Sequence, residues 1–378
     1  MIKSYKIRLY PTKEQEQKMW QHIGACRYIW NYMLALQQQR YKDGEKYLSR
    51  FDTIKLLTPL KQEEDKSWLK NVANRSLQIV CTDLSKAYDE FFKKQGGFPK
   101  FKSRKHSKTN FPTRNERLWF DGIYVNIEKI GKIKYKTDYT IPYGRGNKFT
   151  NPRVSYRNGK WMLGFGMECE NQALILTDKP MGIDLGIKET MTVAYGDEAI
   201  IFHNINKSKI IRTLKKRMKH LQRSISRKYE ANRQGNKYIK TRNIERSEET
   251  LRKMYARLTN IRKNYIHQCT HKLVSLHPSK VVMEDLNVQG MMKNKHLSKA
   301  IQEQCFYEII RQMKYKCGWN GIPFYQVNRF YPSSKTCSCC GHIKSDLKLS
   351  DRTYICSECG TIIDRDLNAA INLQRYVI

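Results

Sequence analysis

The sequence lacks any run of about 18 or more consecutive apolar residues, the length that a transmembrane helix requires. Its first residues mix apolar, polar and basic side chains, so the apolar segment of a secretory signal peptide is also missing. Both absences argue against a membrane-spanning or secreted protein. We therefore expect an intracellular protein without a membrane partner.

Acidic residues are also few, compared with basic ones. The 378 residues include 71 Lys and Arg but only 35 Asp and Glu, so the formal net charge is +36 and the isoelectric point is about 9.8. A solubilising surface is the simple alternative. However, an isoelectric point above about 9 is typical of nucleic-acid-binding domains. The predicted partner is a long polyanion, and its binding should weaken steeply as salt is added.

A disulfide framework is the third feature that we do not expect, because eleven cysteines in a reducing compartment rarely pair. Four of them form two CxxC pairs, Cys337 with Cys340 and Cys356 with Cys359. Four thiolates at this spacing predict a closed tetrahedral Zn²⁺ site, which is structural because no ligand position stays open. Cys339 leaves an ambiguity, since it lies next to Cys340 and could replace it as a ligand.

Three carboxylates stand at positions that suggest a second metal site. Asp184 lies near the end of an apolar strand that opens a predicted three-stranded meander, and Glu284 ends a later apolar strand. Asp366 lies in the first turn of a C-terminal helix. Asp285 and Asp364 compete with the last two. Strand alternation points one of Glu284 and Asp285 inward and the other outward, without deciding which, and Asp364 suits a helix cap. Such acids are typical ligands of Mg²⁺ or Mn²⁺.

Several segments share their motifs with one family: GIDLGIK, VVMEDLN and DRDLNAAINL around the three acids, the CxxC pairs, and KIRLYPT, GACRYIWNYML and FPKFKSRK nearer the N-terminus. They resemble TnpB, the transposon-encoded RNA-guided endonuclease related to type V CRISPR effectors, and the acid-bearing motifs resemble its RuvC-type nuclease half. The similarity spans nearly the whole chain. The family motifs select Glu284 over Asp285 and Asp366 over Asp364.

The resemblance implies an RNA-guided DNA endonuclease that hydrolyses phosphodiesters with two metal ions. Asp184 would bridge both ions, while Glu284 and Asp366 would each hold mainly one. The implied partners are a guide RNA from the transposon end and double-stranded target DNA, next to a short motif that the protein reads. A monomer or homodimer in the cytoplasm of a prokaryotic cell, associated with the nucleoid, is expected.

The fold class that the resemblance implies is α+β with several domains. A split β-barrel, the wedge domain, carries a helical recognition insert, and an RNase H-like RuvC nuclease domain carries an inserted zinc ribbon. The expected boundaries are 1–11 for the first wedge strand, 12–105 for the helical recognition domain, 106–178 for the wedge barrel, 179–334 for the nuclease domain with a basic helical hairpin at 207–277, 335–361 for the zinc-binding target-nucleic-acid-binding module, and 362–378 for the last nuclease helix.

Local signals specify several elements directly. Thr12 and Gln15 predict a capping box at the start of a long helix. Asp121-Gly122 and Asn158-Gly159 predict tight β-hairpins. One continuous helix is expected over 297–316.

Two basic runs are candidate nucleic-acid contacts. In the first run, from Phe98 to Arg104, basic residues alternate with two aromatic ones. The aromatic residues, Phe98 and Phe101, could stack on bases or anchor the loop. The second belongs to the predicted helical hairpin, where few acids balance the charge. A solvated linker or helix face is the alternative for each run. The candidate residues are Lys100, Lys102, Arg104, Lys215, Lys216 and Arg217.

Three other functions fit parts of the sequence. A protein-only transposase or resolvase could share the RNase H-like core but would carry no RNA. A nuclease-inactive RNA-guided repressor would not need Asp184, Glu284 and Asp366. A zinc-ribbon transcription factor would leave these three acids unexplained.

Overall fold

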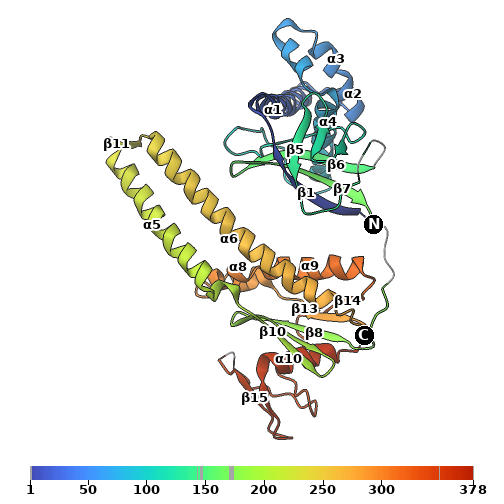
Figure 1. Ribbon diagram of the computed structural model, residues 1–378, viewed down its shortest axis with the longest axis vertical. Coiled ribbons are helices and arrows are strands. Elements are labelled where there is room, and N and C mark those ends of the chain that lie inside the picture. Colours follow the sequence, from blue (N-terminus) through green and yellow to red (C-terminus); the bar gives the residue numbers. More distant parts are fainter. Residues whose placement is uncertain (1, 143, 145–147, 170–173, 349, 378) are drawn as a thin grey trace. The chain divides into compact units, whose positions relative to one another are not determined.

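A computed structural model describes residues 2–142, 144, 148–169, 174–348 and 350–377 of the chain. The outer ends of the first and last expected domains, residues 1 and 378, lie outside this part. The chain divides into two compact units, Met1–Glu170 and Asn171–Ile378 (Figure 1). Each unit has its own hydrophobic core. No helix in the described part is long and apolar enough to cross a membrane.

The first unit contains a seven-stranded antiparallel sheet in the order β2-β6-β7-β1-β5-β4-β3. The chain's first strand, β1, thus lies between strands that form more than 120 residues later, as the resemblance implied. β2 and β3 remain at the two edges in the described residues, so the predicted barrel is an open half-barrel. The strands are β1 (Ile2–Tyr10), β2 (Asn110–Pro112), β3 (Trp119–Asp121), β4 (Tyr124–Ile127), β5 (Gly131–Lys136), β6 (Phe149–Arg157) and β7 (Lys160–Glu168).

Both predicted hairpins are present. Asn158 and Gly159 have φ values of +54° and +76°, which a two-residue turn of the primed type requires. Gly122 has a φ of +54° in the turn between β3 and β4.

Five helical segments accompany this sheet, and the first begins as predicted. The Thr12 hydroxyl accepts from the backbone N–H of Gln15, and the Gln15 side chain accepts from the N–H of Thr12. The helix buries one apolar stripe in the core of the unit. The helices are α1 (Lys13–Lys42), α2 (Arg50–Lys55), α3 (Leu57–Leu60), the 3₁₀ helix η1 (Glu64–Asn71) and α4 (Asn74–Phe92).

The second unit is built on a five-stranded sheet in the order β10-β9-β8-β13-β14. The first three strands form the predicted antiparallel meander, and β13 and β14 run parallel to β8. The strands are β8 (Met181–Leu185), β9 (Glu189–Tyr195), β10 (Glu198–His203), β13 (Val281–Glu284) and β14 (Phe324–Val327).

Helices cover both faces of this sheet. Met181 and Ile183 point into a core shared with α6 (Arg242–Val274) and α9 (Phe306–Trp319). The alternate residues of β8 face the other way, toward the C-terminal helix α10 (Arg365–Gln374). The remaining elements are the 3₁₀ helix η2 (Ile205–Lys207), α5 (Lys209–Ala231), β11 (Arg233–Gln234), β12 (Lys237–Tyr238), α7 (Val288–Met292), α8 (Ser298–Gln304), β15 (Thr353–Ile355) and β16 (Ile362–Asp364).

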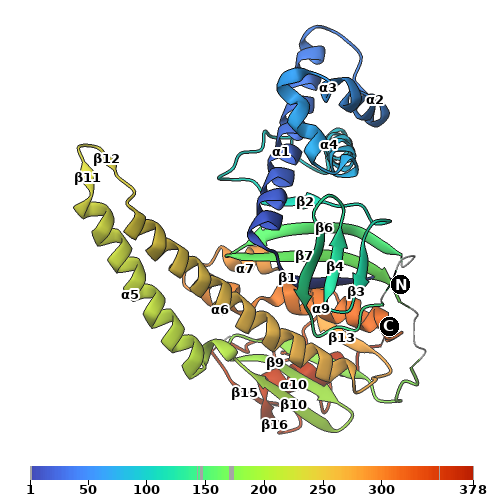
Figure 2. The ribbon, with the colours of Figure 1, turned by 45° about the horizontal axis from the view of Figure 1, so that its top comes forward.

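The basic segment forms a long antiparallel helical hairpin, α5 with α6, in both views (Figures 1 and 2). Its bend falls at Gly235, between the two short strands β11 and β12.

The continuous helix predicted over 297–316 is wrong. Cys305 adopts a left-handed conformation, with a φ of +57°, and separates α8 from α9. The break lets Ile301 on one side and Phe306 on the other both reach the core. It also directs the Gln304 side chain to the carbonyl of Ile187 and the hydroxyl of Thr190. The spacing of apolar residues does not reveal such a break in the helix.

Candidate active site

Two of the candidate acids lie at the same ends of neighbouring parallel strands. Met181 pairs with Val281 and Ile183 pairs with Met283, so the continued register sets Asp184 beside Glu284. Residues opposite each other in a parallel pair point to the same side of a sheet. Both carboxylates therefore extend toward the face that α10 covers.

A close approach of helix and strand brings the third acid to this place. A Cβ atom on Gly182 would overlap the backbone carbonyl of Ala370 and the backbone amide of Gln374, so only glycine lets α10 lie directly on β8. The first turn of α10 then carries Asp366 to the carboxyl end of the strand. One Asp366 oxygen lies 3.9 Å from the position that a Cβ on Gly186 would occupy.

Burial raises the pKa values of two of these acids, and mutual repulsion adds to the effect at Asp184. Burial, then the charges of Glu284 and Asp366, raise the pKa of Asp184 well above its usual value, with Arg365 acting in the opposite direction. Burial also raises the pKa of Glu284, and a hydrogen bond from the Ser333 hydroxyl partly offsets it. Asp366 pairs with Arg365, whose Nη2 lies 2.9 Å from Oδ1.

The two competing acids have other partners. Asp285 forms a half-exposed ion pair with Arg329, at 3.1 Å. Asp364 caps α10, because its side chain accepts from the backbone N–H groups of Asp366 and Leu367 at 2.9 and 3.1 Å. The geometry therefore selects Glu284 and Asp366 as the partners of Asp184.

An open groove of about 1120 Å³ contains all three carboxylates. Its walls bring positive charge from several separate segments, which suits a phosphate backbone that passes the acids. The basic residues of the walls are Lys188, Lys207, Arg329, Lys335, Lys348, Arg352 and Arg365.

The donor set fits hard divalent cations. Among the described residues, no basic side chain lies within 4.0 Å of the carboxylates of Asp184 or Glu284. A buried acid beside a half-buried one, without such a partner, carries a large electrostatic cost, which a bound cation would remove. Carboxylate oxygens are the ligands that Mg²⁺ and Mn²⁺ prefer.

The four predicted zinc ligands form one cluster. The Sγ atoms of Cys337, Cys340, Cys356 and Cys359 all lie within 4.8 Å of one another, as a zinc ribbon requires. Cys339 is exposed and is not part of this cluster, so the ambiguity at the first pair is resolved. Hydrogen bonds from the hydroxyl and backbone of Thr361 lower the pKa of Cys359 to about 6. A backbone hydrogen bond with His342 lowers the pKa of Cys340, but hydrogen bonds with the other three cysteines outweigh it and raise this pKa to about 12.

Side chains of α10 attach this cysteine module to the acid-bearing helix, a role that sequence reasoning missed. The Asn368 carboxamide accepts from the N–H of Ser338 at 2.9 Å and donates to the carbonyl of Thr336 at 2.7 Å. Asn372 donates to the carbonyls of Ser333 and Thr336 at 2.8 and 2.6 Å. Both asparagines are buried, and their spacing of four residues on one helix face was the available signal.

The basic candidates have different surroundings. Lys102 is half-buried, with its Nζ 3.4 Å from the ring centroid of Trp30, and Lys215 forms an ion pair with Glu303 at 2.7 Å. Both are therefore partly structural. Phe98 packs edge-on against Tyr88 and Phe91 and so anchors its loop. The other basic candidates are exposed: Lys100, Arg104, Lys216 and Arg217.

Three family models match the chain. They are described as "Helix-turn-helix domain" over residues 1–46, "Probable transposase" over 167–295 and "Cas12f1-like, TNB domain" over 306–373. Two bacterial proteins that carry the name "Putative RNA-guided DNA endonuclease" are similar along nearly the whole chain. The one from Streptomyces pristinaespiralis is 29% identical over 98% of this chain and 88% of its own length. InsQ from Escherichia coli (strain K12) is 27% identical over 98% of this chain and 91% of its own length.

The predicted resemblance to TnpB is confirmed. The fold agrees with it, because the solved structure of the mini-RNA-guided endonuclease CRISPR-Cas_phi3 matches with a TM-score of 0.50 at 11% identity, over 99% of this chain and 92% of that one. Over residues 1–46, the described part of this TnpB-like chain has a strand and one long helix in place of two helices joined by a turn.

Proposed function

We propose that the protein is an RNA-guided DNA endonuclease of a transposon and that Asp184, Glu284 and Asp366 are its catalytic residues. The convergence of these three carboxylates in one cation-lined groove carries the proposal. The similarity to named RNA-guided endonucleases supplies the substrate class. Within this proposal the second unit is a RuvC-like nuclease domain, and the first unit comprises the wedge and helical recognition domains.

Asp184, Glu284 and Asp366 would together hold two Mg²⁺ or Mn²⁺ ions. The ions would supply an activated water and stabilise the leaving oxygen of a phosphodiester. The chain's own groups orient the ligands. The Ser333 hydroxyl fixes one oxygen of Glu284, and Arg365 fixes one oxygen of Asp366. The basic walls of the groove would bind the phosphates on either side of the scissile bond.

Zn²⁺ in the cysteine cluster would be structural and would keep the module folded against α10. Guide and target would bind through the basic surface, including Lys216 and Arg217 on the hairpin and Lys100 and Arg104 in the first unit. Pairing between guide and target would supply most of the sequence recognition. A short DNA motif next to the target would be read by the first unit.

The test begins with sequencing of RNA that copurifies with the protein. A plasmid that matches this RNA is then incubated with the complex in Mg²⁺. We expect wild type to cut it and Asp184→Ala to bind it without cutting. Asp197→Ala, which changes an exposed acid in the turn between β9 and β10, should cut normally.

The outcomes separate the alternatives. Undiminished cleavage by Asp184→Ala would refute the active-site assignment. Wild type that binds the matched plasmid but never cuts it would favour the repressor. Cleavage by protein that carries no RNA would favour a protein-only transposase or resolvase.

A further inference from the structure

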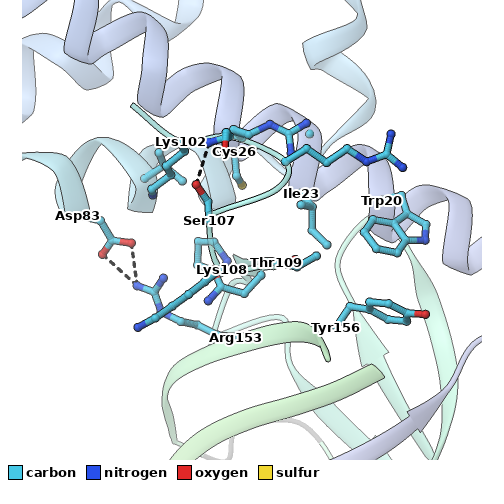
Figure 3. A pocket seen from close by; sticks show the side chains of 17 residues that line it. Trp20, Ile23, Cys26, Asp83, Lys102, Ser107, Lys108, Thr109, Arg153 and Tyr156 are labelled. Carbon is cyan, nitrogen blue, oxygen red and sulfur yellow. Dashed lines mark hydrogen bonds and ion pairs between the residues drawn. The ribbon is translucent and has the colours of Figure 1, made fainter. Parts of the chain in front are cut away.

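A second cavity lies within the first unit, separate from the carboxylate groove. It has a volume of about 490 Å³ and is formed by α1, α4, β2, β6 and the loop between α4 and β2 (Figure 3). This volume lies in the range of about 300–1,000 Å³ that small-ligand sites occupy. Five of the lining residues are basic, and one, Asp83, is acidic. The basic residues are Arg27, Lys102, Arg104, Lys108 and Arg153.

One end of this cavity is aromatic. Trp20 and Tyr156 meet edge to face, with ring centroids 4.9 Å apart, and Trp161 packs behind Trp20 at 5.1 Å. The side chain of Trp20 is still 40% exposed, so part of its ring is available to a ligand. Figure 3 shows Trp20 and Tyr156 together at one side of the cavity and Asp83 with Arg153 at the opposite side.

The other end is cationic and built in advance. Nη2 of Arg153 donates to both oxygens of Asp83, at 2.9 Å each, so these two charges neutralise each other. The excess of positive charge in the lining comes from Arg27, Lys102, Arg104 and Lys108. Asn31 fixes the backbone of Lys102 from both sides, because it accepts from its N–H at 2.7 Å and donates to its carbonyl at 2.9 Å. Ser107 accepts from the N–H of Ser103 at 2.8 Å and closes the loop.

We propose that this cavity binds one unstacked nucleotide of the bound nucleic acid, with its base against Trp20 and Tyr156 and its phosphate at the cationic end. A base inside a duplex has neighbours on both faces, so only an unstacked base can contact the ring of Trp20. An aromatic end and an anion-binding end within one nucleotide-sized cavity match the two halves of such a ligand. The inference rests on the proposed function, because a nucleic acid must be bound.

The nucleotide can come from the guide RNA or from the target DNA, and cross-linking distinguishes these sources. The complex with RNA alone and the complex with RNA and matched DNA are irradiated at 254 nm, and the adducts are located by mass spectrometry. We expect a nucleotide adduct on Trp20 or Tyr156. Its mass shows whether the sugar is ribose or deoxyribose. Adducts confined to residues outside the cavity would overturn the inference.

Affinity measurements give a second test with a matched control. One base stack contributes roughly a 5- to 150-fold gain in affinity, so Trp20→Ala should weaken binding by this factor and Trp20→Phe should restore most of it. Trp68→Ala removes a tryptophan of nearly equal exposure, 41%, in the same unit but outside the cavity, and should have little effect. Equal losses in the two alanine variants would overturn the inference.

Lys102 supplies a third readout, the pH dependence of affinity. Burial lowers the pKa of Lys102 to about 8, with Arg153 acting in the same direction and Asp83 and Cys26 opposing it. Its positive charge is present below this pH and is lost as the pH rises through about 8, so affinity should fall there in wild type and stay flatter in Lys102→Arg. The same pH profile in both proteins would contradict a phosphate contact.

Failure of this inference is distinguishable from failure of the proposed function. Wild type that carries a guide and cuts matched DNA, while Trp20→Ala binds as tightly as Trp68→Ala, would remove only the nucleotide site. Wild type that binds no nucleic acid would remove both.

Discussion

Gly182→Ala tests how the three acids are brought together. The added Cβ would lie closer than 3.0 Å to backbone atoms of Ala370 and Gln374, a separation that real Cβ atoms essentially never show. These atoms belong to a helix backbone and cannot rotate away. The helix α10 must therefore move off the sheet by a distance on the order of 1 Å, because packed interiors have no spare room.

Two effects follow from this displacement. Overpacking of this kind costs about 1–3 kcal/mol, which lowers the Tm of a unit of this size by about 2–4 °C for each kcal/mol. Asp366 moves with α10 while Asp184 and Glu284 stay on the sheet. A misplacement of about 1 Å among groups that act together costs on the order of 100-fold in rate.

The assay compares thermal unfolding and the single-turnover rate of plasmid cleavage. Gly318→Ala is the control, because a Cβ at this position in α9 meets nothing within 4 Å. We expect the control to unfold at or slightly above the wild-type temperature and to cut normally. Wild-type cleavage and Tm in Gly182→Ala would refute the view that the contact between α10 and β8 sets the carboxylate geometry.

Three further predictions concern separate parts of the second unit. In zinc-replete buffer without Mg²⁺ or Mn²⁺, Asp184→Asn should stabilise the protein at neutral pH, because the raised pKa makes the charged acid unfavourable in the folded state. Denaturation across pH should show this gain disappear below about pH 4, where the acid is protonated even when the chain is unfolded. Cys356→Ser should release zinc, measured by metal analysis, and lower cleavage, whereas Cys339→Ser should retain both. Changing Lys216 and Arg217 together to Gln should make the salt dependence of binding weaker, so that the slope of log affinity against log salt becomes less negative by about 1.4–1.8. An unchanged slope would show that these two side chains face solvent and contact no phosphate.

The sequence located the candidate acids better than the contacts that hold them in place. Asp184, Glu284 and Asp366 were singled out by the resemblance of their motifs to one family, because a single acid at a strand end more often caps a turn. Strand alternation puts Glu284 and Asp285 on opposite faces but does not say which faces inward, so the choice of Glu284 also came from the family motif. Hairpin turns and the Thr12 cap are local, since each depends on a few neighbouring residues.

The rest depended on contacts between distant segments. The need for glycine at position 182 comes from a helix that follows almost 190 residues later. The break at Cys305 lets a side chain on each side of it, Ile301 and Phe306, reach the core. The spacing of apolar residues alone favours one continuous helix. Lys102 was expected on an exposed surface, but its position over Trp30 requires knowledge of where α1 passes. Tertiary packing decides all three cases.

The order of the elements has a consequence for how such a protein can change its length. The hairpin of α5 and α6 is inserted between β10 and β13, so it interrupts no strand that bears an acid. Its far end at Gly235 is an exposed turn, the kind of site where insertions and deletions are best tolerated. The cysteine module is different, because Asn368 and Asn372 bond it to the helix that carries Asp366. A shortened or extended hairpin would thus leave the carboxylate geometry intact, whereas an altered cysteine module would need matching changes in α10.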